Sequence, residues 1–287
     1  MSQTEMKRVT GLLIIEVQNS NPNGDPDRES DPRQRPDEHG EISPVSFKRK
    51  LRDLVEQKDG PVWKEMASGI NPPLKVATHG ILESRDTKRS EAVADARAGR
   101  LNEKYWDARV FGNTLLERRE KAEDKHLRTG VAQFGLGVSV APIFVERMTT
   151  TKKAPAQEDK TRGMAPLGFR IVRHAVYTMP FFINPTAAVK TGCSKEDIDL
   201  LLKLIRYAYP HTASYIRPSV EIRHAWCMEH KSALGSCSDF ALIAALTPKK
   251  RVDPERPSQT WDEYEIPTEL PESLREKLED FRDLVAL

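Results

Sequence analysis

The feature that most constrains the fold is an apolar run that stops abruptly in a dense cluster of turn-forming residues. Residues 11–17 read Gly-Leu-Leu-Ile-Ile-Glu-Val, and residues 19–27 read Asn-Ser-Asn-Pro-Asn-Gly-Asp-Pro-Asp. A short apolar run bounded by Asn, Pro, Gly and Asp predicts a strand that ends at a turn. Asn and Asp side chains can hydrogen-bond to the nearby backbone, so we expect the segment after the strand to be ordered, with a defined conformation. We therefore expect a strand over 8–17 and a structured loop over 18–43.

A cationic helix is predicted directly after this loop, over 44–57. Ser43 is a suitable N-cap, and Pro44 suits the first helical position. The apolar stripe of this helix consists of Leu51, Leu54 and Val55. We expect the opposite side, with Lys48, Arg49 and Arg52, to face water, and Lys50 lies in the same cationic run. These cations can neutralise phosphates, and the alternative is an ordinary solvated helix face.

The remaining segments predict an α+β fold. Residues 131–145 and 169–183 are typical of strands, and 194–209 is typical of a helix that begins at the cap Ser194. Further strands near 220–228 and 239–246 can complete a β-α-β-β-α-β order, which is the ferredoxin-like or RRM-like pattern.

Three other segments stand apart from this pattern. Residues 60–108 are interrupted by Gly and Pro and predict an insertion without a large core of its own. Residues 146–168 are rich in Thr, Lys, Ala, Gly and Pro and lie between expected strands at 138–147 and 169–183, which predicts a long projecting hairpin. After a Pro-rich connector, helical spacing predicts an amphipathic C-terminal helix that carries Leu274, Leu278, Phe281 and Val285.

Composition excludes several classes of protein. The chain has 287 residues, 38% hydrophobic and 31% charged, with a net charge of +2, which fits a globular protein with local basic tracks. No apolar run approaches the roughly 20 residues of a membrane helix, and the first residues lack the apolar core of a signal peptide, so we expect a cytoplasmic protein. The three cysteines are widely spaced and the histidines show no metal-ligand spacing, so we expect neither a metal nor a cofactor.

An ordered set of motifs resembles one protein family. Besides the Asn-Pro-Asn-Gly-Asp-Pro-Asp loop and the Lys-Arg-Lys helix start, the set comprises Trp106-Asp-Ala-Arg-Val-Phe-Gly112, Arg128-Thr-Gly-Val-Ala-Gln-Phe134, Glu146-Arg-Met-Thr-Thr150, Met164 and Lys231-Ser-Ala-Leu-Gly235. Over residues 8–246 the chain resembles the backbone subunit of type I CRISPR Cascade complexes, the seventh family of CRISPR-associated proteins within the RAMP superfamily. The type I-C and I-B versions are the most similar, and residues 247–287 have no counterpart.

The resemblance implies an architecture and a set of partners. It implies an RRM-like palm (1–59 and 109–246), an inserted fingers subdomain (60–108), a thumb hairpin (146–168) and a C-terminal extension with an amphipathic helix (247–287). Such a subunit is not an enzyme. It coats CRISPR RNA in multiple copies and presents guide bases to target DNA, together with a 5′-end capping subunit, a large subunit and a helicase-nuclease.

The resemblance also assigns residues to the RNA. The expected RNA-binding residues are Asn19, Asn21, Asn23, Lys48, Arg49, Lys50, Arg52, Arg109, Arg128, Gln133, Phe134, Arg147, Met148, Lys152, Lys153, Arg162 and Met164. Simpler interpretations are turn closure for the asparagines, core packing for Phe134 and a disordered loop for the hairpin.

Two functions of other classes stay open at this stage. One is a RAMP-type endoribonuclease, for which Asp25, Asp27 and Asp31 offer carboxylates, although these residues also suit simple Asx turns. The other is a monomeric RRM-type single-stranded RNA-binding protein, which should display two or three stacking aromatics on its sheet. Formation of RNA-bearing filaments by the purified chain would separate these functions from a coating role.

Overall fold

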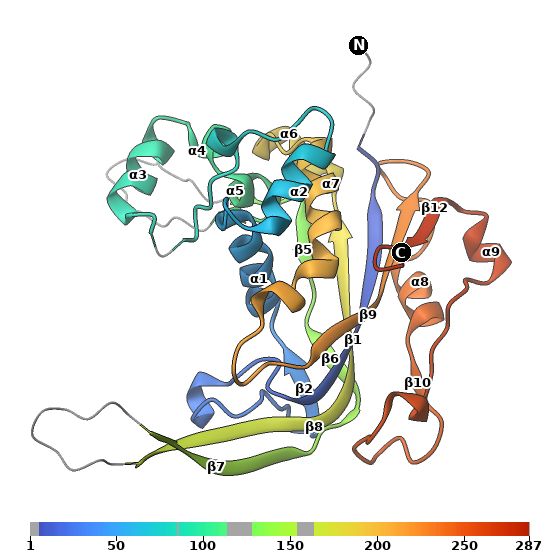
Figure 1. The fold of residues 1–287 in the computed structure, drawn as a ribbon. Helices are drawn as coiled ribbons and strands as arrows, with labels where there is room; N and C mark the ends of the chain where they lie inside the picture. The colour runs from blue at the N-terminus through green and yellow to red at the C-terminus, as the bar shows by residue number, and fades with distance from the viewer. Residues whose placement is uncertain (1–5, 85, 114–127, 154–163, 287) are drawn as a thin grey trace, which may run out of the picture.

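The structure is a computed structural model that describes residues 6–84, 86–113, 128–153 and 164–286. Its centre is an eight-stranded sheet with the order β12-β9-β1-β8-β6-β2, and β5 and β7 also pair with β8 (Figure 1). All of these pairs are antiparallel. The strands are β1 (Val9–Ser20), β2 (His39–Ile42), β5 (Ala132–Phe134), β6 (Gly137–Pro142), β7 (Val145–Lys153), β8 (Met164–Ile183), β9 (Val220–His230) and β12 (Leu278–Asp283).

The first strand is the centre of the sheet. β1 lies between β8 and β9 and continues to Ser20, three residues beyond its predicted end. Leu13 and Ile15 belong to one buried cluster, and Leu12 and Ile14 belong to another on the opposite face. Burial on both faces explains why residues 11–17 form a continuous apolar run without polar alternation.

Helices cover both faces of the sheet (Figure 1). The main core lies under α1 (Pro44–Glu56), α2 (Pro61–Gly69) and α7 (Lys195–Leu204). The second face is covered by α8 (Asp239–Leu246) and by the C-terminal segment, which includes β10 (Lys249–Lys250) paired with β11 (Tyr264–Glu265). None of the helices in the described ranges is long and apolar enough to cross a membrane.

The predicted helix starts are confirmed. The Ser43 side chain accepts a hydrogen bond from the Ser46 amide at 3.2 Å, and Pro44 is the first helical residue of α1. Ser194 and Asp197 form a reciprocal capping box at the start of α7. The α-helix ends at Leu204 and continues as a 3₁₀ turn over Ile205–Tyr207, so it is shorter than predicted.

Residues 60–108 divide between two cores. α2 contributes Val62, Trp63 and Met66 to the main core. The segment after it contains α3 (Arg89–Arg97), α4 (Leu101–Lys104) and α5 (Trp106–Val110), and it surrounds a small separate cluster that includes Leu82 and Tyr105. Short elements complete this end of the molecule, namely β3 (Gly112–Asn113) paired with β4 (Arg128–Thr129), and α6 (Ala188–Thr191).

The predicted hairpin is present, and its arms are regular strands. β7 pairs with the first half of β8 from Val145↔Val172 to Lys153↔Met164. The single strand expected over 138–147 is wrong, because β6 ends at Pro142 and β7 begins at Val145.

Two predicted elements near the C-terminus are also wrong. Residues 239–246 form α8 and not a strand, because Ser238 caps the first turn and the alanines that follow favour a helix. The predicted C-terminal helix is replaced by a single turn, α9 (Glu272–Arg275), and by β12. β12 pairs with β9 with a bulge after Leu278, and this bulge brings Leu278 and Phe281 to the same face. Leu278 and Phe281 are three residues apart, as on one face of a helix, but here the bulge in the strand produces that spacing.

Candidate nucleic-acid interface

The loop after β1 is held by its own asparagines. The Asn23 side-chain oxygen accepts from the Ser43 amide at 2.7 Å, which fixes the loop to the start of α1, and its amide nitrogen donates to the Gly24 carbonyl. Asn21 is buried and donates to the Ser30 carbonyl at 2.9 Å. Turn closure is thus observed for Asn21 and Asn23, whereas Asn19 is exposed in a left-handed conformation with φ of 43°.

The centre of this loop is tight and strained. Asp25 caps a 3₁₀ turn by accepting from the Asp27 amide, and its own amide donates to the Asp31 carbonyl at 2.7 Å. Glu29 and Ser30 follow with φ of 51° and 67°, a region that non-glycine residues rarely occupy. Strain of this kind persists only where surrounding contacts over-determine the backbone, and it concentrates at functional sites.

An ion-pair cluster, which we term the loop–hairpin clamp, fixes this loop to the base of the hairpin. It consists of Asp31 from the loop, Arg147 from β7 and Arg170 from β8. Arg147 Nε donates to Asp31 Oδ2 at 3.0 Å, and Arg170 lies 3.4 Å from Asp31 Oδ1 and also pairs with Glu29. The hydrogen bond from Arg147 lowers the pKa of Asp31 despite the burial of its carboxyl, so the clamp is charged at neutral pH.

Apolar side chains lie near the clamp on the opposite face of the hairpin from Arg147 and Arg170, because successive residues of a strand point to opposite faces. Met148 is 41% exposed and is the cross-strand partner of Phe169. The Phe169 ring meets the ring of Tyr215 edge-on at 5.7 Å, and Tyr215 is 65% exposed. Arg217 ties this segment to the first loop by donating to the Asn21 carbonyl at 2.7 Å. Sequence reasoning missed Tyr215, although an aromatic residue two positions before an arginine offered a signal for it.

The cations of α1 are less accessible than predicted. Arg49 pairs with Asp53 and Glu56 on its own helix. Lys48 is half-buried and lies over the Phe111 ring at 5.2 Å, and burial lowers its pKa. Both side chains therefore already interact with other groups of the protein, and a phosphate would have to compete with these partners.

Two of the predicted contacts on α1 are buried. Arg52 is only 4% exposed, so its expected position on a wet face is wrong. It donates to Asp107 at 2.9 Å, and Asp107 also accepts from the Leu82 amide at 2.7 Å, so this pair joins α1 to the insertion. Lys50 donates to Thr212 at 3.0 Å, and burial, with the charge of Arg217, lowers its pKa to about 8.

Comparison with known proteins identifies the family. Residues 7–269 match the family model described as CRISPR-associated protein Cas7. The chain belongs to the Cas7 family. A relative from Haloferax volcanii with the same description is 24% identical over 217 residues. That match covers 69% of this chain and 63% of the relative, so the chain spans less than two thirds of that protein. The family expected from the sequence motifs is confirmed.

Chains from solved CRISPR complexes have low overall structural similarity to this Cas7 family member. A chain from a CRISPR RNA-guided surveillance complex, pre-nicking, has a TM-score of 0.47 and 14% identity, with 77% of both chains covered. A second surveillance-complex chain has a TM-score of 0.44 and 15% identity, with 77% of this chain and 68% of that chain covered. A chain of type III-B Cmr-beta bound to cognate target RNA has a TM-score of 0.40 and 12% identity, with 78% of this chain and 61% of that chain covered.

Three further predicted contacts in this Cas7 family member hold the fold together. Arg109 is 6% exposed and donates to both oxygens of Asp197, at 2.8 and 2.7 Å. Phe134 is core, as its simpler interpretation proposed, with its ring 5.1 Å from Phe47 and stacked on Phe181 at 5.4 Å. Gln133 donates to the Gly130 carbonyl at 3.1 Å. RNA contact by these residues stays a prediction.

The remaining predicted RNA-binding residues have side chains outside the described part of the chain. Arg162 lies outside the described residues. Arg128 belongs to β4, Lys152 and Lys153 belong to β7, and Met164 begins β8, but their side chains lie outside the described part of the chain. The candidate interface that the described side chains form thus consists of the loop–hairpin clamp, Met148, Phe169 and Tyr215.

Proposed function

We propose that this chain is a noncatalytic, cytoplasmic subunit that binds CRISPR RNA and assembles along it in several copies. Family membership supports this function, and the observation that carries it is the loop–hairpin clamp on one face of the hairpin, with exposed Met148 on the other face and exposed Tyr215 near it. The clamp holds a strained polar loop and an arginine-bearing hairpin in one fixed relation. Because the loop and the hairpin are held rigidly relative to each other, each copy of the chain can contact a regular polymer backbone in the same way.

The clamp leaves donors available for phosphate. The Arg147 side chain is 68% exposed and uses its Nε and one terminal nitrogen on Asp31. A guanidinium carries five N–H donors, so its other terminal nitrogen can reach a phosphate. Phosphate contacts carry no sequence information, and sequence is then read by base pairing of the guide.

The apolar part of the interface suits a role in RNA geometry. Met148 follows Arg147 on β7 and points to the opposite face of the hairpin, so an apolar wedge on one face can separate two stacked bases while the cation on the other face holds a phosphate. We assign 146–168 as the thumb on this basis.

The proposed architecture follows the same family pattern. We assign a ferredoxin-like palm to 1–59 and 109–246, which is supported by the strand order β9-β1-β8-β6 with α1 and α7 on one face. The fingers subdomain is assigned to 60–108, with support from the small separate cluster around Leu82 and Tyr105.

Partners follow from membership of the family. We propose further copies of this chain, target DNA paired with the guide, a 5′-end capping subunit, a large subunit and a helicase-nuclease. The absence of nuclease activity is supported by the loop, in which Asp25 caps a turn and Asp31 is neutralised by two arginines. The charge of Asp31 is already matched by two arginines, which makes this carboxylate a poor metal ligand.

The purified chain tests this function with single-stranded RNAs of equal length and unrelated sequence. We expect oligomers whose protein mass grows with RNA length, uncut RNA, and affinities that agree within a few-fold. Arg147→Gln should lower the slope of log affinity against log salt by about one, whereas Arg147→Lys should retain it. Arg97→Gln, at an exposed residue of α3, is the matched control and should leave the slope unchanged. A hundredfold preference for one sequence, RNA cleavage, or a single bound copy at every RNA length would contradict the function.

A further inference from the structure

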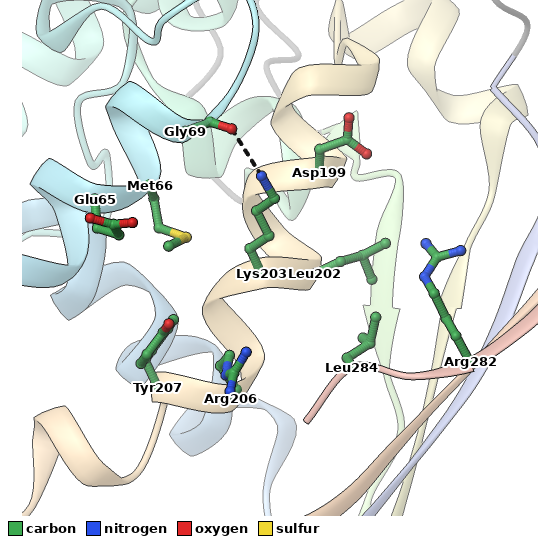
Figure 2. Close-up of a pocket in the computed structure, with 10 residues that line it drawn as sticks. All are labelled: Glu65, Met66, Gly69, Asp199, Leu202, Lys203, Arg206, Tyr207, Arg282 and Leu284. Carbon is green, nitrogen blue, oxygen red and sulfur yellow. Dashed lines mark hydrogen bonds between the residues drawn. The ribbon is translucent and has the colours of Figure 1, made fainter. Parts of the chain in front are cut away.

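Two cavities lie outside the interface described above. The larger, about 450 Å³, lies between α2, α7 and the segment after β12, and Figure 2 shows side chains of both charges around it. Lys203 Nζ donates to the Gly69 carbonyl at 3.1 Å within this cavity, and none of its lining residues belongs to the interface. The second cavity, about 420 Å³, includes Asn19 and therefore adjoins the loop that precedes the clamp. Only the second cavity has a chemistry that indicates a specific ligand.

The floor of the second cavity is a neutralised carboxylate. Along this face of β1, the apolar Leu12 and Ile14 give way to Glu16, which is only 3% exposed. Glu16 accepts from Gln18 at 2.6 Å and from Arg223 at 2.5 Å, and it lies 3.3 Å from His174 Nε2. These partners balance its charge and fix its position, so the cavity has a rigid polar floor.

A bulge in β9 places an arginine over an aromatic ring at this cavity. Ile14 pairs with His224 and Ile15 pairs with Ile222, so Arg223 is the extra residue of β9. Its guanidinium carbon lies 4.5 Å from the centre of the Trp261 ring. Bulges commonly re-aim one side chain beside a functional site.

The tryptophan is held in place by its own turn. Glu263 accepts from the amides of Gln259 and Thr260, at 2.5 and 3.1 Å, and this capping box fixes the 3₁₀ turn that carries Trp261. Trp261 is half-buried and lines the cavity together with the exposed cation Arg173. The ring is thus presented to the cavity with little freedom to move.

We propose that this cavity accepts one unstacked base of the bound RNA, an inference that rests on the proposed RNA-binding function. Single-stranded bases stack on aromatic rings and on guanidinium planes, and Trp261 with Arg223 supplies both. The cavity volume lies within the roughly 300–1,000 Å³ typical of small-ligand sites. Amide groups of Gln18 and Asn19 at the cavity can hydrogen-bond to base edges, and Arg173 can meet the adjoining phosphate. Asn19 joins this cavity to the loop of the interface, so one RNA strand can contact both.

Photo-crosslinking of the wild-type chain to single-stranded RNA that contains 4-thiouridine tests the proposal without a variant. We expect a crosslinked peptide that contains Trp261. Tryptophan fluorescence should be quenched on RNA binding, and Trp261→Phe should remove most of the quench while it keeps affinity within about threefold. Trp261→Ala should weaken binding by about 5- to 150-fold, the range for loss of one stacked base. Arg206→Gln, in the cavity of Figure 2, is the control and should bind like the wild type.

The outcomes separate the two hypotheses. RNA binding of normal affinity by Trp261→Ala, with no crosslink at Trp261 in the wild type, overturns the base site and leaves the proposed function intact. A crosslink that appears only after complementary DNA is added also overturns it, because the occupant is then not the RNA. A wild-type chain that binds no RNA overturns both.

Discussion

Replacement of Arg109 should damage the fold and not the RNA interface. Arg109 donates to both oxygens of Asp197 and to the carbonyls of Thr78 and Asn102, both at 2.9 Å. Arg109→Met keeps much of the side-chain volume but leaves the buried Asp197 without its counter-charge. Removal of one partner from a buried ion pair costs about 3–5 kcal/mol of folding free energy. For a chain of this size, we expect the melting temperature to fall by roughly 10 °C.

The pH dependence of the stability lost in Arg109→Met is a more specific test of this structural role. Burial raises the pKa of Asp197, but hydrogen bonds from Arg109 and His79 and the charge of Arg109 outweigh it, so the pKa falls from 3.8 to about 2. At about 1.36 kcal/mol for each unit of pKa, this difference contributes roughly 2 kcal/mol of stability. A lowered pKa stabilises the folded protein above pH 4, and the contribution is lost as the pH falls toward 2. The gap in stability between wild type and variant should therefore narrow by about that amount between pH 5 and pH 2.

Urea unfolding followed by circular dichroism measures both quantities. Arg97→Met, an exposed arginine on α3, is the matched control and should change the free energy of unfolding by less than about 0.5 kcal/mol. RNA affinity is then measured well below the melting temperature of the variant. A loss of stability under about 1 kcal/mol, or a gap that does not change with pH, would refute the structural role. Weak RNA binding by a variant as stable as the wild type would indicate that Arg109 contacts the RNA.

Two further predictions concern the C-terminal strand and the loop. Deletion of residues 277–287 removes buried Leu278 and the stack of Phe281 on Trp226, and it should cost about 3 kcal/mol in thermal or urea unfolding; a melting temperature within 1 °C of the wild type would show that β12 adds nothing. Asp25→Asn combined with Asp27→Asn should leave RNA as intact as the wild type does during incubation with Mg²⁺, as judged on a denaturing gel. Cleavage by the wild type that this double variant loses would establish the nuclease alternative.

Local signals in the sequence were sufficient where the structure depends on neighbouring residues. The turns of the loop and the cap at Ser43 depend on side chains that bond within a few residues or to the start of the next element. The existence of the hairpin was also predictable, because its composition gives it little to bury.

The same signals failed where distant parts of the chain compete for one surface. Leu278 and Phe281 have a helical spacing, but the edge of β9 offered backbone partners, and one bulge brought both side chains to the same face. Helical periodicity cannot distinguish a bulged strand from a helix over so short a segment.

By itself, the sequence determined the family, the first strand with its loop, and the cationic character of α1. Only the tertiary structure decided which of these cations are accessible. Arg52 and Arg109 are buried because Asp107 and Asp197, 55 and 88 residues further along the chain, need counter-charges in the core. Arg147 remains 68% exposed although the side chain of its partner Asp31 is only 10% exposed, because Arg147 reaches Asp31 from the hairpin strand β7. A charge that is buried must be paired, and which acids are available to pair with it is fixed by the packing of distant segments and not by local sequence.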